Sequence, residues 1–468
     1  MTHDLFILMK SELSLTLIIF ILLTLKVWDG IKDNKTWINT ANVLLLINLV
    51  HSFLHNVSGS LFSGMYFTNE LIATEKIILN LGTFIVSLLS YNWVKYHKHA
   101  AEFYILMIST LLGMQFMISA GNFLMFYLGL ELASIPLAAL VNFDLEKRRS
   151  SEGAMKMILS SAFSSGIMLF GVSLLYGSTG SISFSELPQL ITGTHLQIMS
   201  LIFIFTGFAF KLSAVPFHFW TADVYEGAPA PITAYLSVIS KTAMVFVFIS
   251  VAANLFASIA TVWNNMMFVI ILLTILVGNL FAIRQQNMKR FLAFSSIAQV
   301  GYILLGLMSG QKDGNVAAIY FLIVYLFSNL AIFSVVSVIS SVSGRENINE
   351  YKGFYHNNKL VSWVLAIGLF SLAGIPPTAG FFGKMFLITS GAGSGNYILV
   401  SFAALNMVIS LYYYLRVIKA VFIDKSETPS EKIQVPAASS IAMIICMAGI
   451  ILTGFFGQLY SYLQSLFN

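Results

Sequence analysis

The sequence predicts an all-α polytopic membrane protein, and three observations support this class. The chain is 57% hydrophobic and only 10% charged over its 468 residues, which is too little charge for a soluble protein of this length. Apolar runs of roughly 18 residues or more, the length that a membrane-spanning helix needs, recur along it; "LSLTLIIFILLTLKVW" and "MMFVIILLTILVGNLFAI" are examples. These runs also lack the polar–apolar alternation that the strands of a membrane barrel show.

The apolar runs predict about fourteen spans when roughly 20 residues are taken for each. The spans are predicted near 7–26, 37–56, 72–94, 101–119, 121–142, 153–177, 197–229, 231–254, 262–283, 291–309, 315–342, 361–390, 396–420 and 436–462. The longest polar connections lie near 57–71, 178–196, 343–360 and 421–435, and none of them is long enough for a soluble domain.

The basic residues predict the orientation, because loops that carry Lys and Arg stay in the cytoplasm. Connections that follow odd-numbered spans are basic, and the even-numbered ones hold almost no Lys or Arg, with Lys76 and Lys312 as exceptions. The basic residues after odd-numbered spans are Lys26, Lys32, Lys35, Lys95, Lys98, Lys147, Arg148, Arg149, Arg284, Lys289, Arg290, Arg345, Lys352, Lys359, Arg416, Lys419, Lys425 and Lys432. Both termini should therefore face away from the cytoplasm. The net charge of +5 reflects topology rather than nucleic-acid binding.

The sequence offers no obvious place for a redox centre. A single cysteine, Cys446, excludes a disulfide or an iron–sulfur cluster within this chain, and we expect it to be a small packing residue of the last span. There is no phosphate-binding glycine loop, no nucleotide fingerprint and no cluster of His and Cys with metal-ligand spacing. We therefore expect neither cofactor nor metal in this chain.

A few charged residues fall inside predicted spans. They are Glu131, Lys156, Lys211, Lys241 and Lys384. Charges at membrane depth are costly and usually line an ion pathway or a hydrated cavity. The alternative for Glu131 and Lys211 is a buried ion pair that only fixes helix packing. Lys156 lies near a span end, where it could equally extend to the cytoplasmic surface.

Two spans should be broken within the membrane. Pro216 follows Lys211 in the seventh span, and "SLAGIPPTAGFFG" precedes Lys384 in the twelfth. Proline interrupts the helical ladder, and non-helical backbone is tolerated at membrane depth only inside protein or beside water.

Breaks in corresponding positions point to inverted repeats with an ion path between them. Spans 4–8 and 9–13 would be two five-helix repeats of opposite orientation. The predicted organisation is three N-terminal spans in 1–100, a first repeat in 101–254, a second in 262–420, and a cytoplasmic loop with the last span in 421–468.

Three stretches resemble one known family. "FKLSAVPFHFWTADVYEGAPAPITAYLSVISKTA" from Phe210 to Ala243, "QQNMKRFLAFSSIAQVGYILLGL" and "LFSLAGIPPTAGFFGKMFLI" are similar to subunit N of NADH-quinone oxidoreductase (respiratory complex I, NDH-1). The resemblance covers the chain from the fourth span to the thirteenth. The DVYEGAP…SK stretch separates subunit N from the related antiporter-like subunits and from Mrp-type sodium/proton antiporters of the same fold.

The resemblance implies a polar axis through the membrane, with a half-channel in each repeat. The family residues of this axis match Glu131, Lys211, Lys241 and Lys384. It also implies FMN and iron–sulfur clusters in partner subunits and none here. Antiporter-like subunits would lie on one side and small membrane subunits on the other, in a bacterial inner membrane with both termini in the periplasm. Proline often stands in the family where this chain has Ala222. Gln299 replaces a family histidine and cannot carry charge, so a titratable relay in the tenth span is in doubt.

Lysine suits such an axis because it can lose its proton, whereas arginine stays charged. A buried lysine keeps its proton beside a carboxylate and loses it when the carboxylate moves away. Glu131 and Lys211 could thus form a gate. His218 could line the water path, or it could only cap broken backbone. Asp223 and Glu226 are expected to be structural loop acids.

Three functions compete on this basis. The chain could be a proton-translocating subunit of complex I, a cation/proton antiporter subunit of the Mrp type, or a scaffold that does not pump. The subunit N motif favours the first over the second. Buried titratable residues in both halves argue against the third, since a scaffold does not need them.

Overall fold

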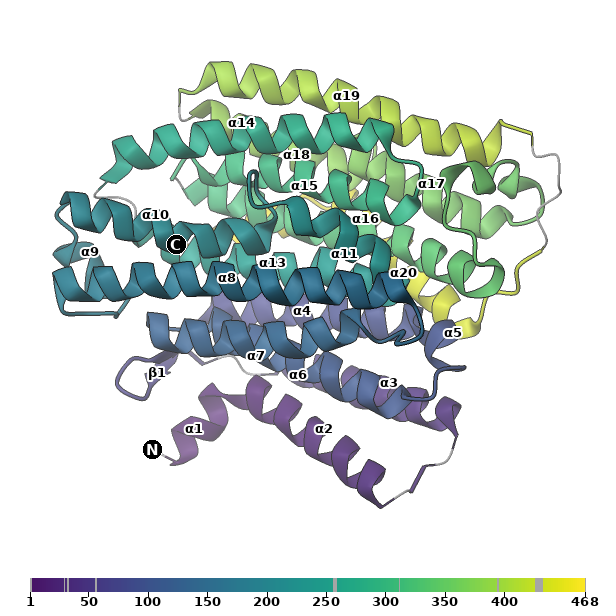
Figure 1. Ribbon diagram of the computed structural model, residues 1–468, viewed down its shortest axis with the longest axis horizontal. Coiled ribbons are helices and arrows are strands. Elements are labelled where there is room, and N and C mark those ends of the chain that lie inside the picture. The colour runs from purple at the N-terminus through teal and green to yellow at the C-terminus, as the bar shows by residue number, and fades with distance from the viewer. Residues whose placement is uncertain are drawn as a thin grey trace. The chain divides into compact units, whose positions relative to one another are not determined.

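The structure is a computed structural model that describes residues 2–28, 30–31, 33–54, 57–255, 259–310, 312–393, 395–425 and 432–467. In these ranges the chain is a succession of helices with one small antiparallel hairpin, formed by β1 (Gly59–Leu61) and β2 (Tyr66–Thr68) (Figure 1). This confirms the predicted all-α polytopic class.

The helices follow one another with short connections. The first part of the chain forms α1 (Thr2–Leu8), α2 (Lys10–Val27), α3 (Asn34–Ser52), α4 (Glu70–Leu89), α5 (Tyr91–Val94), α6 (Ala100–Ile118), α7 (Phe123–Val141), α8 (Arg148–Thr179), α9 (Leu187–Leu190), α10 (His195–Leu212), α11 (Phe219–Gly227), α12 (Ala230–Ala234), the π-helix η1 (Tyr235–Ser240) and α13 (Lys241–Leu255). The rest forms α14 (Ala260–Arg284), α15 (Met288–Leu307), α16 (Lys312–Ser343), the short 3₁₀ turns η3 (Ile348–Tyr351) and η4 (Phe354–His356), α17 (Lys359–Ala373), α18 (Ala379–Gly393), α19 (Tyr397–Phe422), α20 (Ala437–Phe455) and α21 (Gln458–Ser465).

The helices agree with the predicted spans. Among the described residues, 11 helices are long and apolar enough to cross a membrane, and the other predicted spans coincide with α2, α3 and the pair α17–α18. Three details of the prediction were wrong. The last span ends at Phe455 rather than at 462, because α21 is a separate helix. Lys76 lies inside α4 rather than in a connection, and Lys312 is the first residue of α16.

Both predicted helix breaks are present. α10 ends at Leu212, Ser213 adopts φ of +63°, and the chain becomes helical again only at Phe219. α17 ends before Gly374, whose φ of +81° reverses the chain ahead of the Pro376–Pro377 pair. These irregular segments interrupt the backbone ladder next to Lys211 and ahead of Lys384, as proline and glycine there predict.

The chain divides into two compact units. The first comprises Met1–Ser87, Val94–Leu212 and Ile239–Asn265, and the second comprises Leu88–Trp93, Ser213–Val238 and Met266–Asn468. In the first unit α6 packs on α7 and α8 packs on α10, whereas α16 is the central helix of the second and contacts α17, α18 and α20. One boundary between the units falls at the break after Leu212. The predicted repeat limits remain a prediction.

Small residues set the closest helix contact of the first unit. A side chain at Gly113 of α6 would place its Cβ 2.4 Å from the Ala133 nitrogen, and one at Gly129 of α7 would lie 2.6 Å from the Met117 nitrogen. Glycine at both positions lets the two backbones approach closely, as is usual between membrane helices. This contact positions the middle of α7, which carries Glu131.

Candidate functional site

Lys211 lies in the last turn of α10, where the carbonyl end of a helix favours a cation. Its ammonium donates hydrogen bonds to Ser134 Oγ on α7 at 2.6 Å and to Ser161 Oγ on α8 at 2.8 Å. Ser134 donates its own hydrogen to the Leu130 carbonyl at 2.6 Å, so an oxygen lone pair is left for the lysine. Three helices of the first unit therefore hold this ammonium.

Glu131 precedes Ser134 by three residues on α7, so both side chains lie on the same part of the helix surface. Glu131 and Lys211 are half-buried. Within the described ranges they form no direct ion pair, although the negative charge of Glu131 is close enough to attract the Lys211 ammonium. The gate between these two residues remains a prediction. Sequence reasoning missed both serines; the spacing from Glu131 could have indicated Ser134.

Lys241 is the first residue of α13 and is 3% exposed. It directly follows the π-helix η1, a type of irregularity that frequently occurs at functional sites. Within the first unit α13 packs against α10. The helices that carry Lys241 and Lys211 are therefore neighbours, as a relay between these lysines would require.

Lys384 is fully buried at the second break. Its ammonium lies 3.4 Å from the Ala373 carbonyl at the end of α17 and 5.2 Å from the centre of the Tyr302 ring. A Cβ on Gly374 would come within 3.2 Å of the lysine side chain, so glycine there also makes room for it. Helix-end carbonyls and an aromatic face both favour a cation.

Gln299 lies at the same helix end. Its amide nitrogen donates to the Leu372 carbonyl at 3.4 Å and to the Tyr414 hydroxyl at 3.0 Å, and Tyr414 in turn lies 2.5 Å from Ser295 Oγ. Gln299 and Lys384 thus bind successive carbonyls of α17.

The other predicted residues of the seventh span lie in or next to α11, in the second unit. His218 precedes α11 in the second unit, where it is buried and packs against Phe219 with ring centres 4.5 Å apart. Asp223 and Glu226 lie within α11 rather than in a loop, so that detail of the prediction was wrong. They bind the Arg290 guanidinium at 2.7 and 2.8 Å, a contact that joins α11 to α15.

Lys156 is exposed on α8 and pairs with Glu152 at 2.8 Å, as a lysine at a membrane surface would. Cys446 is buried in α20. In the part of the chain that the structure describes, no group of three or more His, Cys, Asp or Glu side chains is suited to hold a metal ion.

Comparison with known proteins identifies the family. Residues 120–410 match the model of the transmembrane family NADH:quinone oxidoreductase/Mrp antiporter. The chain belongs to this family. It is 46% identical to "NADH-quinone oxidoreductase subunit N" of Azobacteroides pseudotrichonymphae genomovar. CFP2 over 468 residues, with 98% of each chain covered.

Solved structures agree with this membership of the NADH:quinone oxidoreductase/Mrp antiporter family. A chain of respiratory complex I from Thermus thermophilus with bound aureothin is 28% identical, with a TM-score of 0.79 over 95% of this chain and 98% of that one. A chain of the Mrp complex from Dietzia sp. DQ12-45-1b has the same fold at 18% identity, with a TM-score of 0.86 over 97% and 96%. Glu131, Lys211, Lys241, His218 and Lys384 all lie inside the segment that matches the family model.

Proposed function

We propose that this chain is a proton-translocating membrane-arm subunit, of the subunit N type, in an NADH-quinone oxidoreductase. The observation that carries the proposal is the setting of Lys211. Its ammonium lies at the end of a broken helix and bonds Ser134 and Ser161, and Ser134 is one turn from Glu131 on α7. Two relatives named NADH-quinone oxidoreductase subunit N, 46% and 44% identical to this chain, support the assignment to subunit N.

The two hydroxyls and the acid offer Lys211 alternative partners. In the observed arrangement neutral oxygens hold the ammonium, which stabilises its charge less than a carboxylate would. When Glu131 approaches, the lysine keeps its proton. When it withdraws, the proton can pass towards Lys241, whose helix packs against α10. An arginine could not take part, because it does not release its proton.

Lys384 would serve the second half of the axis. The carbonyl end of α17 and the Tyr302 ring stabilise its charged form. Gln299 holds the neighbouring carbonyl and the Tyr414 hydroxyl, so it can orient water without titrating itself. His218 lies at the other break and would line a hydrated path there.

The redox chemistry belongs to other subunits in this proposal. FMN and iron–sulfur clusters in those partners would pass electrons from NADH to quinone, and this chain would act as part of a translocase without a redox centre of its own. Its neighbours would be antiporter-like subunits on one side and small membrane subunits on the other. The chain would lie in a bacterial inner membrane, as the resemblance to subunit N implies, and its basic loops support an orientation with both termini in the periplasm.

A cation/proton antiporter subunit is the second candidate. The likeness to the Mrp complex chain supports the shared fold, but at 18% identity it says nothing about the transported ion. A scaffold without transport is disfavoured by the buried lysines at both breaks. Co-purification separates these functions, since only a complex I subunit should migrate with flavin and iron–sulfur subunits.

Substitution of Lys211 by arginine tests the proton carrier directly. The Lys211→Arg variant keeps a positive charge but cannot release a proton. We expect a complex that assembles but takes up few protons into inverted membrane vesicles during quinone-linked NADH oxidation. Normal uptake per assembled complex would mean that Lys211 is a fixed charge.

A further inference from the structure

The N-terminal helices contain a buried ion pair outside the segment that matches the family model. Lys76 on α4 and Glu12 on α2 are 3% and 1% exposed, and Lys76 Nζ lies 2.7 Å from Glu12 Oε1. The Tyr66 hydroxyl accepts from Lys76 at 3.0 Å, and its own hydrogen can be donated to Glu12 Oε2 at 3.1 Å or to the Leu8 carbonyl at 3.0 Å. An acid, a lysine and a phenol therefore form a closed cluster in the first unit.

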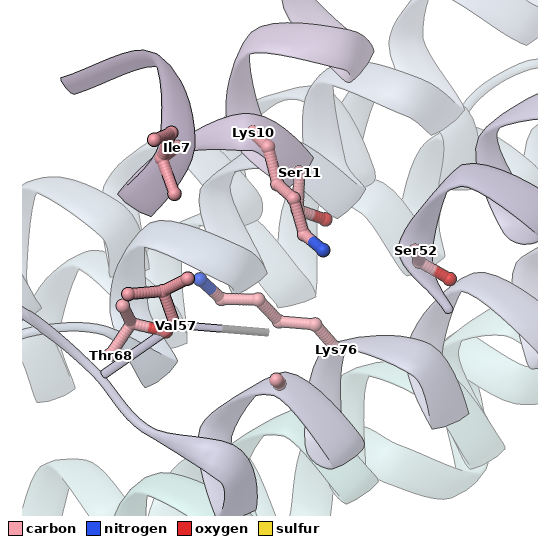
Figure 2. A pocket seen from close by; sticks show the side chains of 8 residues that line it. Ile7, Lys10, Ser11, Ser52, Val57, Thr68 and Lys76 are labelled. Atoms are coloured by element: carbon pink, nitrogen blue, oxygen red, sulfur yellow. The ribbon is translucent and has the colours of Figure 1, made fainter. Parts of the chain in front are cut away.

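A small cavity reaches this cluster from one end of the helices. Its volume is about 20 Å³, enough for one water molecule, which needs roughly 10–15 Å³. Figure 2 shows Lys76 lying across the cavity with its ammonium towards Val57 and Thr68. Lys10, Ser11, Ser52 and Thr68 supply polar groups to the lining.

Polar residues continue from Lys76 along one face of α4. Lys76, Asn80, Thr83 and Ser87 recur every three or four residues, which places them on one side of the helix, and we name them the N-terminal polar seam. All four are at most 3% exposed. With a rise of about 1.5 Å per residue they extend over roughly 16 Å, about half the hydrocarbon thickness of a bilayer.

Neighbouring helices add polar groups to the seam. Gln115 on α6 donates to Asn80 Oδ1 at 2.9 Å, and Ser87 donates to Asn42 Oδ1 on α3 at 2.6 Å. Three buried polar atoms of this set have no hydrogen-bond partner among the described residues: Asn80 Nδ2, Thr83 Oγ1 and Gln115 Oε1. Buried polar atoms normally find a partner, and water is the partner that fits a polar site. Successive seam residues rise by about 4.5–6 Å, a step that one bridging water can span with two hydrogen bonds.

We propose that the N-terminal polar seam is a hydrated proton-conducting path, additional to the axis through Lys211 and Lys384, with Lys76 as its titratable group. Water in the cavity contacts the Lys76 side chain on one side. On the other side, Asn80, Thr83 and Ser87 hydrogen-bond a chain of water molecules along α4. Glu12 and Tyr66 hold the lysine between them. While Glu12 lies beside it, the ammonium keeps its proton. When Glu12 moves away, the ammonium gives a proton to one water and takes one from another. The inference rests on the proposed function, since it supplies a second route for the same ion.

Polar side chains between membrane helices can also act only as packing contacts. Two substitutions separate this alternative from conduction. Lys76→Arg keeps the charge beside Glu12 but cannot release a proton. Thr83→Val keeps the shape of the side chain and removes only its hydroxyl. The matched control is Thr110→Val on α6, where a buried hydroxyl bonds the Leu106 carbonyl of its own helix at 2.9 Å.

The readout is proton uptake per NADH oxidised in inverted vesicles that contain the assembled complex. We expect Lys76→Arg and Thr83→Val to lose part of the uptake while Thr110→Val matches the unsubstituted complex. If the Thr83→Val complex assembles and takes up protons as well as Thr110→Val, the inference is overturned. This result is decisive even if the Lys76→Arg variant fails to assemble. Lys211→Arg in the same vesicles reports separately on the proposed function. If Lys211→Arg has reduced uptake and Thr83→Val has normal uptake, only the conducting role of the seam is refuted. If Lys211→Arg has normal uptake and Thr83→Val has reduced uptake, only the role of Lys211 is refuted.

Discussion

Replacing Ser134 with alanine should slow proton translocation without preventing assembly. The substitution removes the oxygen that lies 2.6 Å from the Lys211 ammonium and leaves Ser161 as the remaining hydroxyl partner at 2.8 Å. A hydrogen bond to a charged group contributes about 1.5–3 kcal/mol. Because Lys211 is half-buried and keeps one partner, we take the lower limit, about 1.5 kcal/mol, which changes the equilibrium that holds the ammonium at this position about tenfold.

The assay for Ser134→Ala is proton uptake into inverted vesicles during quinone-linked NADH oxidation, normalised to assembled complex. Ser134→Thr retains a hydroxyl and should behave nearly like the unsubstituted complex. Ser164→Ala is the matched control, since it removes a buried hydroxyl of α8 whose bond to the Thr206 carbonyl is long at 3.4 Å. Equal uptake by Ser134→Ala and Ser164→Ala would refute the argument that the serine positions Lys211.

Three further predictions follow from the topology, the acid and the second break. Single cysteines placed in the connections 142–147 and 344–358 should react only with reagents added from the cytoplasmic side; labelling from the other side would reverse the orientation. Glu131→Gln should assemble but lose most proton uptake and Glu131→Asp should keep part of it, whereas full uptake by Glu131→Gln would show that the charge is dispensable. Gly380→Ala should reduce the amount of assembled complex on native gels, because its Cβ would lie 1.7 Å from a carbonyl oxygen of α17 and such overpacking costs about 1–3 kcal/mol or more. Gly166→Ala, where no neighbouring atom lies within 4 Å, is its control and should assemble normally.

The sequence by itself determined the spans, the breaks and the candidate lysines. Each of these depends on short-range properties of the chain. A run of apolar residues has to be helical in lipid because every backbone group needs an internal partner. Pro216 and the Pro376–Pro377 pair, which remove backbone donors, stand in the two interrupted segments. A lysine within such a run, such as Lys384, is conspicuous because its burial is costly.

Only the tertiary structure decided which groups these lysines contact. The hydroxyls that hold Lys211 come from Ser134 and Ser161, which lie 77 and 50 residues earlier in the chain, and serine is too common in membrane helices to be singled out by pattern. Lys76 was assigned to a connection because it lies near the start of its span, yet α4 carries it inward to Glu12, 64 residues away. The hydrophobicity of a segment and its prolines determine the local structure of that segment. The hydrogen bonds and ion pairs of a side chain depend instead on which helices pack together.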